Sequence, residues 1–379
     1  ANALRAQTVG LQVTGENIAN ANTPGYIREE VVFQPAPTQR LGNLLLGMGV
    51  EVSGVIQKID HFLEDRLRGA TSDRADSEVR EQAYLELESI IGELGESDLS
   101  TTLNEFFGSI HEILNQPESI PVRQLAALKG ETLASEIRRL HDRVSDVRDD
   151  ANEQVADLAS DVNRLVREIA ELNRKIAETE GGDTTESDAV GLRDQRHKAL
   201  ADLAELVEIR AREQPDGSVT VFAGGDFLVF HKEHRQVSVR TESVGGVGTS
   251  TIVIDGANSP LAIGAGKLAG LIAARDGVFQ DFANRLDDFS RALAFEFNKL
   301  FSSGQGLRGY DSLTGEAEIA DADLVLDEAG LAFTPTSGSF QVLVKNKLTW
   351  LTRTTDITID LHGLGDDTTL ADVLDQLNA

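Results

Sequence analysis

The chain has 379 residues, of which 63 are Asp or Glu and 35 are Lys or Arg, so its formal net charge is −28 at pH 7. This excess of negative charge argues against nucleic acid and against an anionic membrane surface as partners. The absence of cysteine excludes disulfides and thiolate metal sites, and no apolar run is long enough to predict a membrane-spanning helix.

The first 60 residues contain five acidic and four basic side chains, so this end of the chain is nearly neutral and suggests a packing surface. Within it, the stretch ENIANANTPGY (16–26) follows a short amphipathic segment. Thr23-Pro24-Gly25-Tyr26 predicts a tight turn, because proline presets the first central φ and glycine supplies the positive φ at the second. We expect a helix to end near residues 20–22 and an extended segment to begin near residue 26.

Apolar residues between 133 and 176 recur at steps of three and four, with one stutter at Val147, Ala151 and Val155. This spacing predicts a helix of about 60 residues over 119–180. A helix of that length needs partners, and 59–94 and 266–301 show similar spacing. We therefore predict an elongated antiparallel bundle of long helices. Its predicted core comprises Leu140, Val144, Leu158, Leu165, Ile169, Leu172, Phe282, Leu286, Phe289 and Leu293.

The segment between the second and third long helices alternates apolar and polar residues on both sides of Pro215-Asp216-Gly217, which is a hairpin signal. The predicted fold class is multidomain α+β: the helical bundle carries an inserted β meander and is followed by a small mainly β domain. The expected parts are 1–55 (helix, turn and extended segment, an assembly layer), 56–205 with 262–302 (the bundle, or rod), 206–261 (the meander) and 303–379 (the start of an outer domain, expected to be truncated).

No set of residues has the spacing of a catalytic or ligand-binding site. His231 and His234 are three residues apart, but their flanks predict strands, where such residues face opposite sides. The group Asp194 to Arg196 at the start of a predicted helix suggests a structural ion pair. The glycine-rich stretches lack the spacing of nucleotide-binding loops. We therefore expect no catalytic residues, no cofactor and no metal, and no enzymatic activity.

Four stretches together resemble the hook-associated protein 1 family of bacterial flagellar axial proteins. They are the opening NIANANTPGY, GVEVSGVIQKIDHFLEDRLRGA (49–70), GLRDQRHKALADLAELVEI (191–209) and GKLAGLIAARDGVFQDFANRLDDFSRALAFEFN (266–298). They occur in the family's order and cover roughly residues 3–310. The part after about residue 330 matches less clearly.

The resemblance implies a secreted structural protein of the bacterial flagellum that acts in motility. Such a protein is exported by the type III apparatus without a cleaved signal peptide. Outside the cell it polymerises at the hook tip and forms the hook–filament junction. The implied partners are further copies of the chain, hook protein, the neighbouring hook-associated junction protein and an export chaperone.

In the family the two ends of the chain pair as helices in the innermost layer. Against that pattern we expect a fragment that lacks the extreme amino terminus and the carboxy-terminal helix, whose residues 1–20 would be mobile without a partner. The expected assembly motif is Asn20, Asn22, Thr23, Pro24, Gly25 and Tyr26.

Two alternatives remain open. The nearer is another axial protein, such as hook protein or distal rod protein, which would share the opening turn but be mainly β after it. The more distant is a secreted enzyme carried on a helical stalk, with its chemistry in residues 303–379.

Overall fold

The computed structural model describes residues 2–23, 25–41, 44–92, 98–180, 189–244, 247–256, 260–302, 304, 309–314, 319, 321–331, 334–363 and 366–378. The chain forms two compact units, residues 1–290 and 291–379. Helices and antiparallel strands both occur, so the fold is α+β as the sequence predicts. In the part of the chain that is described, no helix combines the length and apolar composition needed to cross a membrane.

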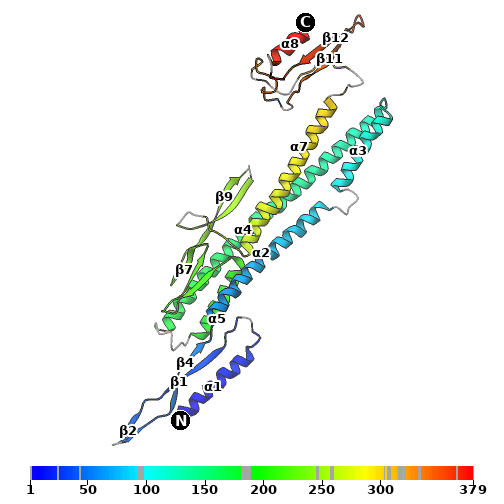
Figure 1. The fold of residues 1–379 in the computed structure, drawn as a ribbon. Coiled ribbons are helices and arrows are strands. Elements are labelled where there is room, and N and C mark those ends of the chain that lie inside the picture. The colour runs from blue at the N-terminus through cyan, green and yellow to red at the C-terminus, as the bar shows by residue number, and fades with distance from the viewer. Residues whose placement is uncertain are drawn as a thin grey trace. The chain divides into compact units, whose positions relative to one another are not determined.

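The amino-terminal layer is a helix packed on a two-stranded ribbon (Figure 1). β1 (Glu29–Pro35) pairs with β4 (Val50–Gln57) in antiparallel register, with an irregularity between Val32 and Phe33. Ala6 and Val13 of α1 are buried. The helix therefore has a partner within the chain, contrary to the expectation that residues 1–20 would lack one. The elements are α1 (Asn2–Ala19), β1 (Glu29–Pro35), the short pair β2 (Gln39–Leu41) and β3 (Leu44–Leu46), and β4 (Val50–Gln57).

Long helices follow, as the apolar spacing predicts. Asp60 caps the first of them by accepting hydrogen bonds from the amides of Phe62 and Leu63, and Gly92 ends it with φ of 58°. The longest helix has 61 residues and packs against its neighbours along the first unit. The helices are α2 (His61–Ile91), α3 (Leu99–Asn115), α4 (Ile120–Glu180) and α5 (Val190–Leu206).

The expected core residues differ in how far they are buried. Fully buried ones are Leu140, Val144, Leu165, Ile169, Leu172 and Leu286. Leu158, Phe282 and Leu293 are half-buried. Phe289, expected in the core, is 36% exposed. It follows Leu286, the last buried residue of its helix, so the apolar spacing continues beyond the last fully buried position of α7.

The returning helix is interrupted, whereas the sequence predicts one helix over 266–301. Its segments are α6 (Lys267–Ala273), the π-helix η1 (Ala274–Phe279) and α7 (Gln280–Ser302). Arg275 in the π-helix is buried and donates hydrogen bonds to the Ser250 carbonyl oxygen at 2.7 Å and to Asn152 Oδ1 at 3.0 Å. Gly270 lets α6 approach α2, because a Cβ there would lie 2.8 Å from Cβ of Val79.

The meander between α5 and α6 forms a four-stranded sheet and a separate two-stranded pair, all antiparallel. Val219, Val221, Leu228 and Val229 are buried in the same apolar cluster as the middle of α4 and the end of α5. The strands are β5 (Arg210–Glu213), β6 (Val219–Ala223), β7 (Asp226–Phe230), β8 (Glu233–His234), β9 (Val237–Val244) and β10 (Val247–Ile254).

In the second unit, β11 (Gly338–Lys345) and β12 (Thr352–Ile359) form a hairpin, and α8 (Leu370–Asn378) packs on β12. Ile357 and Leu326 are buried there. This unit begins at Arg291, and the expected domain boundary at residue 303 stays a prediction. The finer division of the first unit into layer, bundle and meander stays a prediction.

Candidate functional site

The turn after α1 has the geometry that its residues predict. The Tyr26 amide donates to the Thr23 carbonyl oxygen at 3.2 Å, and Gly25 has φ of 80°, as the third position of a type II turn requires. Thr23 is tied back to Asn20, because its Oγ1 donates to Asn20 Oδ1 at 3.2 Å. Asn22 is exposed. Pro24, also expected in this motif, lies outside the described residues.

Asn17, which sequence reasoning missed, holds the turn against the ribbon. Its Nδ2 donates to the Glu29 carbonyl oxygen at 2.9 Å, and its Oδ1 accepts from the Glu29 amide at 2.9 Å. The Tyr26 hydroxyl donates to the same Oδ1 at 3.1 Å. Asn17 lies four residues after the buried Val13, and this helical spacing is the signal that could have singled it out.

The turn rests on α5, although about 170 residues separate the two in sequence. A Cβ at Gly25 would lie 3.7 Å from Cβ of Lys198. One turn earlier on α5, Asp194 accepts hydrogen bonds from Gln57 Nε2 at 2.6 Å and from the Ile27 backbone. Two of the stretches that carry the family resemblance, 17–26 and 191–209, therefore meet in one junction.

Carboxyl groups gather at this junction and their pKa values are raised. Burial raises the pKa of Asp194, although the hydrogen bonds from Gln57 and Ile27 act in the opposite direction. Burial also raises the pKa of Glu29, and the charges of Glu16 and Asp194 add to the effect. The pKa of Tyr26 is raised by burial and by the same neighbouring carboxylates. The junction therefore gathers half-buried carboxyl groups whose protonation is sensitive to pH.

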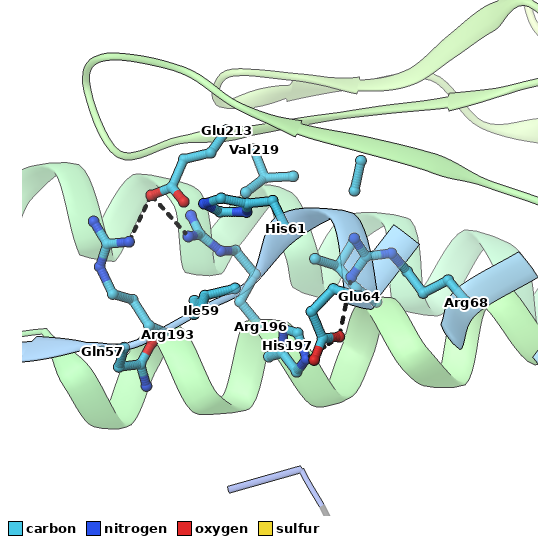
Figure 2. A pocket seen from close by; sticks show the side chains of 12 residues that line it. Gln57, Ile59, His61, Glu64, Arg68, Arg193, Arg196, His197, Glu213 and Val219 are labelled. Carbon is cyan, nitrogen blue, oxygen red and sulfur yellow. Dashed lines mark hydrogen bonds and ion pairs between the residues drawn. The ribbon is translucent and has the colours of Figure 1, made fainter. Parts of the chain in front are cut away.

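A small cavity of about 40 Å³ is lined by mostly polar side chains, which Figure 2 shows. It adjoins the junction through Gln57, which lines the cavity and donates to Asp194. Side chains from α2, α5 and the meander sheet meet there, so the cavity marks the place where these elements join. Its polar lining comprises Gln57, His61, Glu64, Arg68, Arg193, Arg196, His197 and Glu213.

Two arginines of α5 are held by structural contacts around this cavity. Arg193 binds Glu180 at 2.7 Å and Glu213 at 2.6 Å, and the Glu180 side chain has no exposed surface. The hydrogen bond to Glu180 is the main cause that raises the pKa of Arg193. Arg196 donates to Asn173 Oδ1 at 3.0 Å and to the Gly217 carbonyl oxygen at 2.6 Å, and burial lowers its pKa to about 10. These contacts join α5 to α4 and to the meander.

One cluster has the residue types of a nucleophilic relay but not its geometry. Ser218 Oγ and Asp216 Oδ2 both lie 3.0 Å from Nδ1 of His231. A relay needs the hydroxyl on one ring nitrogen and the carboxylate on the other. His234 is exposed on β8. Across the described ranges, no three His, Asp or Glu side chains are grouped so that they could share a metal ion.

Two family models match the chain. The model of the flagellar hook-associated protein FlgK helical domain matches residues 84–316. The model of the flagella basal body rod protein matches residues 1–26, which include α1 and the turn. The two matched regions contain both of the stretches that meet at the junction.

Curated relatives named flagellar hook-associated protein 1 align over most of the chain. The Bacillus subtilis protein is 25% identical and covers 89% of this chain, and the chain spans 76% of its length. The Salmonella typhimurium protein is 26% identical over 82% of this chain, which spans only 56% of that protein. Among solved structures, the flagellar hook junction protein FlgK from Burkholderia pseudomallei is similar, with 23% identity and a TM-score of 0.47 over 56% of this chain and 39% of that one.

Proposed function

The chain belongs to the flagellar hook-associated protein FlgK family, and on that premise we propose that it polymerises at the hook tip and forms the hook–filament junction. Membership gives it a structural role in the flagellum. The observation that supports polymerisation at the hook tip is the junction. There the turn after α1 rests on α5 beside Lys198 and is held through Asp194. The amino-terminal layer and the helical rod are thereby joined.

One side of α1 supports the assembly proposal. Leu4, Leu11 and Ile18 recur every seven residues, and each is more than 70% exposed. Residues at this spacing lie on one face of a helix, and an exposed apolar stripe favours packing against another helix. We propose that this stripe contacts neighbouring axial subunits, next to the motif formed by Asn20, Asn22, Thr23, Pro24, Gly25 and Tyr26.

The proposal includes no catalysis. The Asp216, Ser218 and His231 cluster has the wrong hydrogen-bond pattern for a relay. The named contacts of Arg193 and Arg196 are with groups of the protein itself. These observations support a structural rather than an enzymatic role.

We further propose that the protein is exported by the flagellar type III apparatus and acts outside the cell. Its partners would be further copies of itself, hook protein, the neighbouring hook-associated junction protein and an export chaperone. The net charge of −28 supports protein partners over nucleic acid or an anionic membrane.

The test is a deletion strain of the organism that encodes this chain. We expect hooks with few or no filaments and filament subunits released into the medium. Complementation with Leu11→Lys should fail, since it places a charge in the exposed stripe, whereas Gln12→Lys on the exposed neighbouring position keeps a donor for Glu16 and should restore filaments. Normal swimming of the deletion strain, without a second copy of the gene, would refute the proposal.

A further inference from the structure

The outer side of the meander sheet has a row of arginine and phenylalanine side chains. The strand register places Arg210 of β5 opposite Phe222 of β6, and Phe222 opposite Phe227 of β7. Directly opposite residues share one side of an antiparallel sheet. The Arg235 guanidinium lies over the Phe227 ring, 3.9 Å from its centroid. With Arg212, which is two residues from Arg210 and points the same way, these residues form what we call the Arg–Phe face.

The Arg–Phe face is open, and among the described residues its cations Arg210 and Arg212 form no ion pair. Phe222 is 37% exposed, and Arg210 and Arg212 are also exposed. A groove beside the face is lined by Arg210, Arg212 and Phe222, and also by Asp65 and Glu208. In the described part of the chain neither carboxylate forms an ion pair with these arginines, nor does any other. Arginine and aromatic side chains are enriched at the centres of protein–protein interfaces, so this face has the composition of a docking surface.

The opposite charge lies on one side of α4. Six exposed acidic residues of α4 follow one another at sequence intervals of four, three, one, three and four. At these intervals their side chains lie on one face of the helix, over a length of about 22 Å. None of them forms an ion pair among the described residues, and the buried Val144, Ala151 and Val155 lie on the other side of the helix. We call this the acidic stripe: Asp142, Asp146, Asp149, Asp150, Glu153 and Asp157.

Within one copy the two surfaces do not meet. The inner side of the sheet, with Val219 and Val221, is buried in the cluster that contains α4, so the Arg–Phe face points away from α4. Two copies that each carry a charge of −28 repel one another. A contact between them is favourable where a cationic patch meets acidic side chains.

We propose that the Arg–Phe face of one copy docks on the acidic stripe of α4 in a second copy. This inference rests on the proposed self-assembly and assigns a lateral contact to it. Because the two surfaces differ, the contact is heterologous, and repetition of such a contact generates a ring or a helical assembly. The contact weakens as salt concentration rises, since its charges are screened.

Disulfide cross-linking in cells tests the contact, and the chain's lack of cysteine keeps the background low. Differently tagged Arg212→Cys and Asp149→Cys chains are co-expressed in the deletion strain and oxidised on intact flagella. We expect a cross-linked dimer from the pair and none from either variant alone. Normal filaments without a cross-linked dimer would overturn the docking and leave the junction role standing, whereas normal swimming of the deletion strain would overturn the junction role itself.

Charge reversal in the purified full chain provides an independent readout. Arg210→Glu with Arg212→Glu should weaken self-association about tenfold, equivalent to roughly 1.4 kcal/mol. Adding Asp146→Lys with Asp149→Lys to the same chain should restore it. The control is Arg285→Glu with Asp281→Lys, two exposed positions on α7, which should change nothing. Association that is insensitive to the reversal, or is not restored by the compensating pair, would contradict the proposal.

Discussion

The side-chain amide of Asn163 on α4 pairs with both backbone groups of Val237: Nδ2 donates to the Val237 carbonyl oxygen at 2.7 Å, and Oδ1 accepts from the Val237 amide at 2.8 Å. Val237 is the first residue of β9. A carboxamide presents the same donor and acceptor as a peptide group, so it satisfies the backbone groups of Val237 although β9 has only β10 as a paired strand. The meander is therefore attached to the rod by hydrogen bonds as well as by apolar packing.

The same pairing recurs at the starts of other strands. Asn17 pairs with Glu29, the first residue of β1, and Asn173 pairs with Val219, the first residue of β6. At Ser250, inside β10, two side chains share this role. Asn152 Oδ1 accepts from the Ser250 amide at 2.7 Å, and Arg275 donates to the Ser250 carbonyl oxygen. Asn152, Asn163 and Asn173 are about three helical turns apart on α4, so one helix aligns successive strands of the meander.

Asn163→Asp should lower the free energy of unfolding by about 1–3 kcal/mol, because a carboxylate accepts from the Val237 amide but leaves the Val237 carbonyl oxygen without a donor. Urea unfolding measures the change. Asn284→Asp on the exposed surface of α7 is the control and should stay within about 0.5 kcal/mol. Equal effects at the two sites would mean that the pairing contributes little to stability.

Glu180→Gln should lower the free energy of unfolding by about 1.5–3 kcal/mol, since it replaces the buried carboxylate 2.7 Å from Arg193 by a neutral amide, while Glu213 still pairs with that arginine. Glu178→Gln, two residues earlier, removes a carboxylate that is 56% exposed and pairs with Arg174. That control should cost less than about 1 kcal/mol. Chemical unfolding of the two variants beside the native chain decides the matter, and a loss below 1 kcal/mol in Glu180→Gln would contradict the prediction.

Gly25→Ala should cost about 1–2 kcal/mol locally, because an alanine at φ of 80° is strained. Gly15→Ala, inside α1 with open space around its Cβ position, should instead stabilise the helix by about 0.5–1 kcal/mol. Hydrogen exchange measured at residues 4–18 and along α4 reports both. We expect faster exchange of α1 in Gly25→Ala with α4 unchanged, so uniform loss of protection would show that the turn supports the whole unit.

The junction should become more stable as the pH falls. The pKa values of Asp194 and Glu29 are raised in the folded chain, so the folded state binds protons more readily than the unfolded state. The stabilisation therefore grows as pH falls through the raised pKa values and is lost as pH rises above them. Hydrogen exchange of α1, followed across that range and corrected for the intrinsic rate, should show this dependence.

Asp194→Asn should reduce that dependence, and Asp202→Asn, an exposed change on the same helix, should leave it intact. A pH dependence that persists unchanged in Asp194→Asn would place its origin elsewhere in the chain.

Much of the fold follows from local patterns. The steps of three and four predict the 61-residue α4 closely, because helical periodicity depends only on residues one turn apart. Thr23-Pro24-Gly25-Tyr26 predicts its turn for the same reason, since the φ preferences of its residues are intrinsic. The π-helix at 274–279 was not predicted. It places Arg275 on Ser250 and Asn152, which are distant in sequence.

The sequence by itself determined the element types, the acidic character and the family resemblance, all of which depend on composition and short-range spacing. Only the tertiary structure decided that Asn17 holds Glu29, that Asp194 receives the turn, and that Arg210 lies in line with Phe222. An asparagine amide pairs with whichever backbone groups come within about 3 Å of it. Which backbone groups lie that close depends on how segments far apart in the chain pack. No local sequence pattern determines the distance between such segments.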